Sequence, residues 1–252
     1  MKVKNLISPE FRITIGNYEF TEGVAVECFS SEETHMDWCK VVLAEELEGL
    51  FEFEPMTAAK VELGYEDDFD TLIDGYARQE ADAWQEIMIK DDLSKLEQLT
   101  VKDTFVDCTP QDIVRYLLIQ AGITNYQLSD FKYEKKQVVV INERNGIKAL
   151  TALNAAWNIK VSFFFRDGIF YWGTQKEQKE MYILEEDETI MSLERYGSYW
   201  EAETLGIPWI HHGQEIEVEH EKFSGVATVK KTIVKSDASG AVSMYICFTG
   251  GL

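Results

Sequence analysis

The chain has 252 residues, of which 45% are hydrophobic and 27% charged, a composition typical of a folded globular protein rather than a disordered one. It has 24 Lys and Arg against 45 Asp and Glu, and its formal net charge of -21 has the same sign as phosphates and anionic lipids, which excludes stable nucleic-acid binding as an expected function. Four prolines and sixteen glycines are too few for a linker-rich or low-complexity chain.

The N-terminus places two lysines before a short apolar patch and lacks the apolar stretch of roughly 7–15 residues that a secretory signal needs. No run of about 18 apolar residues is present, so membrane insertion is not expected. Cys28, Cys39, Cys108 and Cys247 form no C-x-x-C pair. Their sparse distribution predicts reduced, mostly buried thiols in a protein made in a cytoplasm, with a disulfide framework as the alternative.

Charge divides the chain into three regions. Residues 1–105 carry 25 acids and 9 bases, residues 106–180 carry 8 and 10, and residues 181–252 carry 12 and 5. Together with the hydrophobic pattern described below, this division predicts an α+β, mainly β protein: a first β-barrel domain (1–105), an α/β insert domain (106–180) and a second β-barrel domain (181–252).

In the first region, alternating and β-rich segments predict a series of short strands. These are residues 12–15, 23–29, 38–43, 60–65, 71–77, 87–89 and 99–105. Residues 44–56 differ, because Leu47, Leu50, Phe51 and Phe53 have roughly helical spacing. A short helix plugging one end of a small antiparallel barrel is therefore expected there.

The second region begins with a well-marked helix over residues 109–122. Thr109 is the predicted N-cap, Pro110 the first helical residue and Asp112 the third, and Gly122 ends the helix. A strand over 137–142 and a second helix over 145–157 follow. Arg166-Asp167-Gly168 then predicts a tight turn between the aromatic strands 160–165 and 168–172.

The third region contains few helix signals. Residues 182–191 open it, residues 215–220 alternate strictly, and residues 225–234 and 241–248 form a long hairpin around the turn 236–240. These strands predict the second small barrel.

Chemical motifs are mostly missing. The sequence has no G-x-G-x-x-G, Walker A or G-x-S-x-G pattern, and Asp70, Asp74 and Gly75 match only part of a calcium loop. The adjacent His211 and His212 point to opposite faces of an extended chain, so exposed turn histidines are expected rather than a metal site. We therefore predict no catalytic, cofactor-binding or metal-binding residues and no cofactor.

The aromatic runs 163–165 and 170–172 offer two interpretations. They are typical of a hairpin buried on both faces, and the alternative is a surface on which sugars stack.

Four stretches, in their order, resemble the tail baseplate hub proteins of bacteriophages and phage-like particles, including the late control protein D group. The first is residues 60–76, a predicted strand pair in which a strand ends in Gly-Tyr, and the second is the predicted helix within 108–122. The third is residues 149–172, which contain the Asp-Gly-Ile-Phe-Tyr-Trp hairpin, and the fourth is residues 208–248, which contain His-Gly-Gln-Glu-Ile-Glu-Val. The resemblance spans nearly the whole chain, and family members are often longer.

The resemblance implies a structural protein and not an enzyme. It implies two tube-like barrels per chain and a homotrimer ring of six barrels, which joins the hexameric tail tube to a tip or spike and lets DNA pass. The implied partners are further copies of the chain, tail tube or distal tail proteins, the tape measure protein and a spike or tip protein. The implied location is the virion tail, assembled in the bacterial host cytoplasm. The acidic charge of the predicted barrels suggests the further hypothesis that DNA passes without adhering to their inner surface, and the alternative is that the charge serves only solubility.

Two other functions are weighed against this one. The first is a cell-wall hydrolase or carbohydrate-binding tail module, against which the missing catalytic acid or zinc set counts. The second is an effector-carrying spike of a contractile secretion system, but the sequence lacks the repetitive β-helix that such spikes add.

Overall fold

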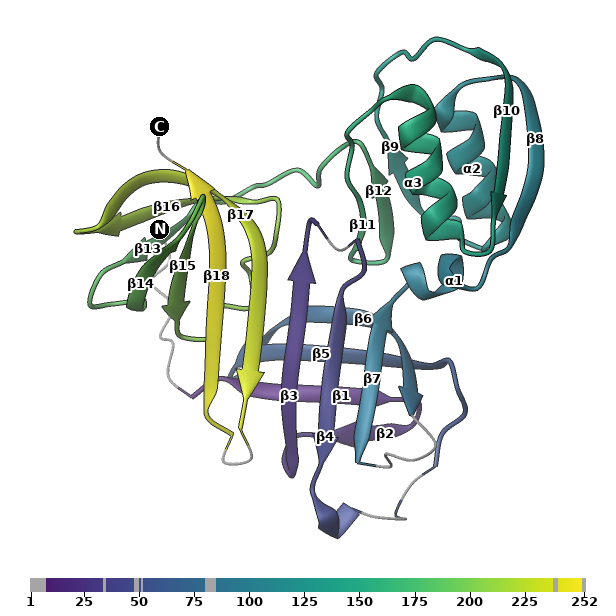
Figure 1. Ribbon diagram of the computed structural model, residues 1–252. Coiled ribbons are helices and arrows are strands. Elements are labelled where there is room, and N and C mark those ends of the chain that lie inside the picture. The colour runs from purple at the N-terminus through teal and green to yellow at the C-terminus, as the bar shows by residue number, and fades with distance from the viewer. Residues whose placement is uncertain are drawn as a thin grey trace. The chain divides into compact units, whose positions relative to one another are not determined.

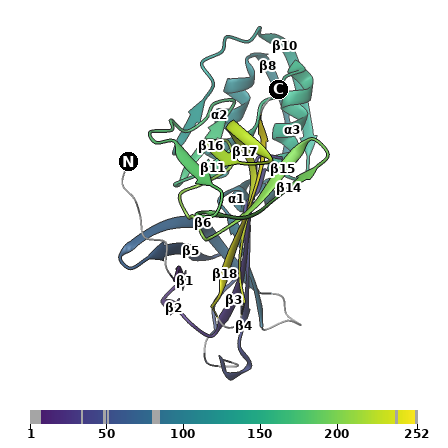
Figure 2. The ribbon, with the colours of Figure 1, turned by 90° about the vertical axis from the view of Figure 1, so that its left-hand side faces the viewer.

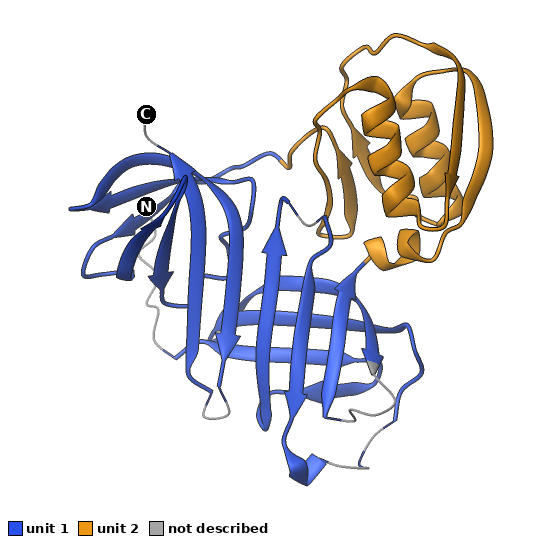
Figure 3. Ribbon diagram, in the orientation of Figure 1, with its two compact units in different colours: residues 1–91, 177–252 blue, residues 92–176 orange. Residues whose placement is uncertain are grey.

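The computed structural model describes residues 8–33, 35–47, 50, 52–79, 85–237 and 240–250. The chain divides into two compact units: unit 1 comprises residues 1–91 and 177–252, and unit 2 comprises residues 92–176 (Figure 3). The two β-rich ends of the sequence thus belong to one unit. The unit boundaries lie at 91/92 and 176/177, compared with the predicted domain boundaries at 105/106 and 180/181.

Unit 1 is built almost entirely of strands. They are β1 (Glu10–Ile15), β2 (Tyr18–Phe20), β3 (Val24–Ser31), β4 (Trp38–Leu43), β5 (Thr57–Tyr65), β6 (Asp68–Gln79), β7 (Glu86–Asp91), β13 (Tyr182–Glu185), β14 (Ile190–Tyr196), β15 (Tyr199–Thr204), β16 (Glu215–His220), β17 (Phe223–Ser236) and β18 (Val242–Gly250).

Within the described residues these strands form one sheet in the order β14-β15-β18-β17-β3-β4-β7-β6-β5-β1-β2, with β16 beside β17 and β13 beside β16. The long strand β17 joins the two halves of the unit. Residues 223–228 pair with β16, and residues 231–236 pair with β3. The half made of β1–β7 and the half made of β13–β18 are therefore continuous through backbone hydrogen bonds.

The sheet of unit 1 curls around its own core. In Figure 1, β1, β5 and β6 run across behind β3 and β7, and Figure 2 shows β3 and β18 almost edge-on with β5 and β6 to one side. Alternate residues point inward along each strand, as in β1, where Ile13 and Ile15 are fully buried. The same cluster of buried side chains includes Ile216 and Phe248 of the other half. The predicted α+β, mainly β fold is confirmed, and the strands of unit 1 form one curled sheet that is antiparallel except for the parallel pair β13 and β16.

Gly75 shows why one position in β6 excludes a side chain. A Cβ atom there would lie 1.9 Å from the carbonyl oxygen of Lys90 and 2.8 Å from the Cα of Asp91, its register partner in β7. The glycine is explained by this close approach of two strands. It lies inside paired β6 rather than in a calcium loop.

The helix expected over residues 44–56 is not formed over the described part of that range. A single 3₁₀ turn, η1 (Glu45–Leu47), is followed by irregular chain over 52–54, and Phe51 lies outside the described residues. Pro55 disfavours helical geometry at Glu54, in agreement with the irregular chain over 52–54. Leu47 and Phe53 nevertheless pack against the core, so their spacing reflects burial without a helix.

Unit 2 is a compact α/β insert. Its elements are α1 (Leu93–Glu97), β8 (Val101–Cys108), α2 (Pro110–Gln120), β9 (Tyr126–Leu128), β10 (Lys136–Glu143), α3 (Gly146–Trp157), β11 (Phe163–Arg166) and β12 (Ile169–Trp172).

The two long helices of unit 2 pack against a two-stranded ribbon of β8 and β10. The expectation that residues 99–105 continue the first sheet is wrong, because β8 pairs with β10 from Val101↔Glu143 to Cys108↔Lys136. A strand pattern specifies a half-buried segment but not its partner, and here the partner lies nearly thirty residues later.

The aromatic hairpin of β11 and β12 is buried on both faces, as the first of its two interpretations predicts. Phe163, Phe164 and Phe165 are at most 6% exposed, and Trp172 is fully buried. The Nε1 of Trp172 donates a hydrogen bond to Oδ1 of Asn154 in α3 at 3.1 Å. These rings consequently offer no open platform on which a sugar could stack.

Candidate interaction surfaces

The adjacent histidines are buried, which corrects the expectation of exposed turn histidines. The side chains of His211 and His212 are 12% and 0% exposed. Ile210, 1% exposed, belongs to the core and draws this segment inward, and its apolar side chain is the sequence signal that pointed to burial. The Nε2 of His211 lies 3.5 Å from Oδ2 of Asp70, whereas that of His212 lies 3.9 Å from Oδ2 of Asp37.

The two rings therefore contact different carboxylates. In the part of the chain that the structure describes, no three His, Cys, Asp or Glu side chains come together in a way that could hold a metal ion.

All four cysteines are free and buried, as predicted. Cys28 and Cys39 are register partners on β3 and β4, and the Sγ of Cys28 donates to that of Cys39 at 2.6 Å. Burial raises the pKa of Cys39 well above its usual value, with a further contribution from Cys28. Burial also raises the pKa of Cys247 to about 12. The pKa of Cys108, which precedes the N-cap of α2, is raised as well, first by burial and then by the charge of Asp112. These three thiols stay protonated at neutral pH, which is unsuited to nucleophilic catalysis.

The negative charge belongs to unit 1. Its residues include 36 acids and 13 bases, net -23, whereas unit 2 has 9 acids and 11 bases, net +2. Electrostatic repulsion between copies is therefore concentrated in one unit, and unit 2 is the part of the chain that an acidic surface does not repel.

A row of three glutamates follows one face of β16. Glu215, Glu217 and Glu219 alternate with the buried Ile216 and Val218. Their register partners on β17 are Thr228, Val226 and Ser224, none of which is a cation. We call Glu215, Glu217, Glu219 and the exposed Val226 the β16 acidic row.

The other neighbour of the β16 acidic row adds more negative charge. Glu185 on β13 is the register partner of Glu219. The pKa of Glu185 is raised, first by a hydrogen bond with Glu188 and by its charge, and further by the charge of Glu219. Acidic side chains thus crowd together at this corner of unit 1.

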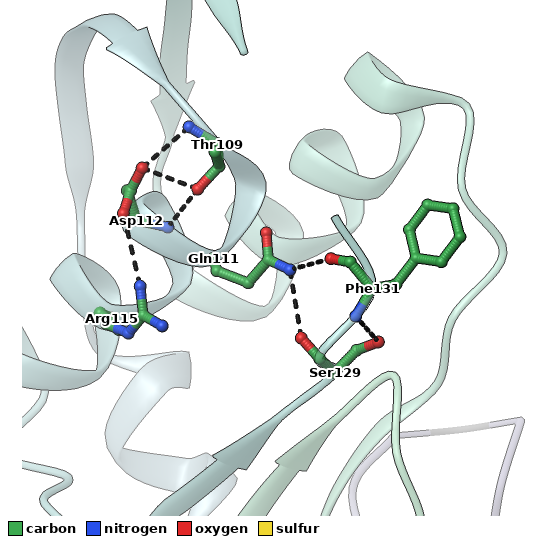
Figure 4. Close-up of polar contacts among 6 residues, drawn as sticks. All are labelled: Thr109, Gln111, Asp112, Arg115, Ser129 and Phe131. Carbon is green, nitrogen blue, oxygen red and sulfur yellow. Dashed lines mark hydrogen bonds and ion pairs between the residues drawn. The ribbon is translucent and has the colours of Figure 1, made fainter. Parts of the chain in front are cut away.

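In unit 2, the start of α2 is fixed by a reciprocal cap (Figure 4). The backbone N–H of Thr109 donates to Oδ2 of Asp112 at 2.9 Å, and the N–H of Asp112 donates to Oγ1 of Thr109 at 3.3 Å. The predicted N-cap is thereby confirmed. Hydrogen bonds from Thr109 lower the pKa of Asp112, and Arg115, 3.4 Å away, contributes in the same direction.

The same helix holds a loop that presents an exposed aromatic ring (Figure 4). The Nε2 of Gln111 donates to the carbonyl oxygens of Ser129 and Phe131 at 3.1 and 2.7 Å. The Phe131 side chain is 64% exposed, and its ring lies 4.7 Å from that of Tyr133. A large apolar group on a backbone held in this way is typical of an interface anchor.

The outer face of the β8–β10 ribbon is apolar. Val106, Val138 and Val140 are 70%, 60% and 69% exposed, and Val138 is the register partner of Val106. We call these three valines the ribbon face. Their neighbours on the same face include the exposed Lys102, opposite Asn142. The sequence shows the valines plainly, but their exposure follows only from knowing that β8 pairs with β10.

Unit 1 has open strand edges. In the described part of the sheet, β14 and β2 end the path, and the outer side of β14 carries only an isolated bridge between Glu186 and Ile190. Met191 and Tyr196 on β14 are 56% and 46% exposed. Unpaired N–H and C=O groups along such a strand are available to another chain. Among the described residues, no helix has both the length and the apolar character needed to cross a membrane.

No protein-family model matches the sequence, and no curated protein matches it. Solved structures do. The chain is similar to a 43 kDa tail protein of prophage MuSo2 from Shewanella oneidensis, with a TM-score of 0.73 and 13% identity, over 96% of this chain and 98% of that one. It is also similar to a tail protein from Neisseria meningitidis MC58, with a TM-score of 0.70 and 10% identity, over 97% of each chain.

A third similar structure is the E. coli c3393 protein, a component of the type VI secretion system that resembles the T4 bacteriophage tail proteins gp27 and gp5. Its TM-score is 0.70 at 10% identity, over 95% of this chain and 77% of that one. At these identities the likeness establishes the fold. The chain has the fold of prophage tail proteins and of hub-like tail components, which confirms at the level of fold the resemblance to the tail baseplate hub proteins.

Proposed function

We propose that the chain is a structural component of a phage or phage-derived tail, in which three copies form a hub ring between the tail tube and the tip or spike. One observation carries the proposal: a single chain contains two curled halves joined edge to edge through β17 and β3. The similarity to prophage tail proteins over almost their whole length supports the same role.

The arrangement of the halves suits a ring. Three chains with two halves each would place six halves around one axis, which suits a six-fold tube while keeping three-fold symmetry. The open edge of β14 gives each chain a surface on which a neighbouring chain can continue the sheet. A head-to-tail contact of this kind closes when the rotation between copies completes a circle.

The charge of unit 1 suits a channel for DNA. A net charge of -23 on that unit repels the phosphate backbone, so DNA passes without binding stably. The proposed partners are further copies of this chain, tail tube or distal tail proteins, the tape measure protein and a spike or tip protein. The proposed location is the virion tail.

We assign no enzymatic activity to this role. Three of the four thiols have raised pKa values. The aromatic hairpin that suggested sugar binding is buried. These observations count against the alternative, a cell-wall hydrolase or carbohydrate-binding tail module.

Purified tails carrying an affinity tag on this chain test the proposal. Gold labelling in negative-stain images should mark the tail end distal to the head, and zymography of the purified protein on cell walls should show no clearing. Label distributed along the whole tail, or none on it, would refute the hub role. A cleared zone that persists in repeated purifications would favour the hydrolase.

A further inference from the structure

The ribbon face of unit 2 is an exposed apolar surface in a strongly acidic protein. Val106, Val138 and Val140 are each at least 60% exposed and lie side by side through the β8–β10 register. Contiguous exposed apolar side chains of this kind mark interaction sites in soluble proteins.

The charges around the ribbon face distinguish it from the rest of the molecule. Lys102 lies beside it on the same side of the β8–β10 ribbon, and Asp107 at the end of β8 is paired with Lys135 at 3.0 Å. The acid nearest the centre of the ribbon, Asp103, lies on the opposite face, where it accepts a hydrogen bond from Tyr116 at 3.0 Å. The ribbon face is therefore apolar with a positive character.

Both strands of the ribbon have an open side. Within the described residues β8 and β10 pair only with each other, and each is eight residues long. An edge of this length is normally covered or charged in a protein that stays monomeric.

The β16 acidic row offers the complementary pattern. Val226 is 52% exposed, and its register partner is Glu217. Glu215 and Glu219 flank that pair on the same face, with no cation opposite them on β17. The β16 acidic row has an apolar centre with negative neighbours, and the ribbon face has an apolar centre with a positive neighbour, so the two surfaces are complementary. The first belongs to unit 1 and the second to unit 2.

We propose that the ribbon face of one copy packs against the β16 acidic row of a second copy, with Lys102 facing Glu217. The contact is head-to-tail, because each copy contributes a different surface to its two neighbours. This proposal names one contact between neighbouring copies in the proposed ring. It rests on the proposed function only for the expectation that several copies of the chain assemble.

A charge swap in the full-length protein tests the contact. Sedimentation equilibrium at low salt gives the dissociation constant between copies. Lys102→Glu and Glu217→Lys should each raise that constant about tenfold, which corresponds to about 1.4 kcal/mol. The double variant should recover most of the affinity. Val138→Ser should also weaken association, because it removes apolar contact area.

Lys148→Glu is the matched control, since Lys148 is an exposed lysine of unit 2 on α3. It makes the same change of charge and should leave association unchanged. Circular dichroism and thermal unfolding confirm that each variant is folded.

Several results would overturn the contact. They are a wild-type chain that remains monomeric at every concentration, a dissociation constant unchanged by Lys102→Glu and Val138→Ser, and a double variant that is not rescued. If tagged tails nevertheless carry the chain at their distal end, the hub role stands and only this contact is wrong. If the swap succeeds but the tails lack the chain, the hub role is wrong and the contact stands.

Discussion

Thr109 and Asp112 form a cap whose two hydrogen bonds satisfy N–H groups that a helix start otherwise leaves open. Replacing Thr109 by alanine should lower the free energy of unfolding by about 1 kcal/mol, the usual cost of losing an N-cap. Urea denaturation followed by circular dichroism measures it. Thr151→Ala, an exposed threonine inside α3, is the control and should have little effect. An equal loss in both variants would contradict the capping role.

The cap also predicts a dependence on pH. Because its hydrogen bonds lower the pKa of Asp112, the folded state favours the carboxylate form. This stabilisation is fully present above the ordinary value of 3.8 and is lost as the pH falls through the lower folded value. The wild-type protein should therefore be more stable than the Asp112→Asn variant at pH 7, and the difference should shrink below pH 3.8. A difference that grows in acid would contradict it.

Gly75 gives a third prediction at the residue scale. Alanine there would place its Cβ 1.9 Å from the carbonyl oxygen of Lys90, so β6 and β7 would have to separate. We expect a loss of about 1–3 kcal/mol in the free energy of unfolding, typical of overpacking. Denaturant titration measures the loss, and unchanged stability would show that the strands are farther apart than the register implies.

At the scale of elements, the β16 acidic row should destabilise unit 1 by repulsion between like charges. Changing Glu215, Glu217 and Glu219 together to glutamine should raise the melting temperature at low ionic strength. The increase should disappear in about 1 M salt, where the Debye length is about 3 Å. Differential scanning calorimetry at two salt concentrations measures both effects.

Glu62→Gln is the control, because the carboxylate of Glu62 is paired with a cation: its Oε1 lies 2.5 Å from Nζ of Lys60. Its neutralisation removes an attraction rather than a repulsion. That substitution should not raise the melting temperature at low salt. A triple variant with the same stability as the wild type at low salt would show that the row experiences little repulsion.

Elements whose signals are local could be predicted from the sequence. Helix α2 has its cap and its proline within four residues, and Asp167 and Gly168 take the positive φ angles, 51° and 68°, that their turn requires. The pairing of β8 with β10 was missed because it depends on tertiary contacts that no local pattern contains. The burial of His212 and the irregular chain over 52–54 did have local signals, the apolar Ile210 and Pro55, but each signal is a single residue.

The candidate surfaces were likewise predictable only in their local features. The valines and glutamates are visible in the sequence, and the charge difference between regions locates the acids correctly. That Val106, Val138 and Val140 share one exposed face depends on a register between two strands separated by a helix and a loop.

At the scale of the molecule, one chain carries two curled halves in a continuous sheet, and unit 2 is inserted between them in the sequence. The joining strand β17 places the halves in one compact unit with a shared cluster of buried side chains. Such a pair of halves is a suitable repeating unit for a ring, because the pairing of β17 with β3 fixes the two halves to each other within one chain.

The most direct test of the hub role is electron cryomicroscopy of purified tails, with particle averaging at the distal end and no symmetry imposed. We predict three copies of this chain around a central opening, with the six curled halves near six-fold positions and the sheets of neighbouring copies in contact. A ring with another number of copies, or this chain found away from the tail axis, would contradict the account.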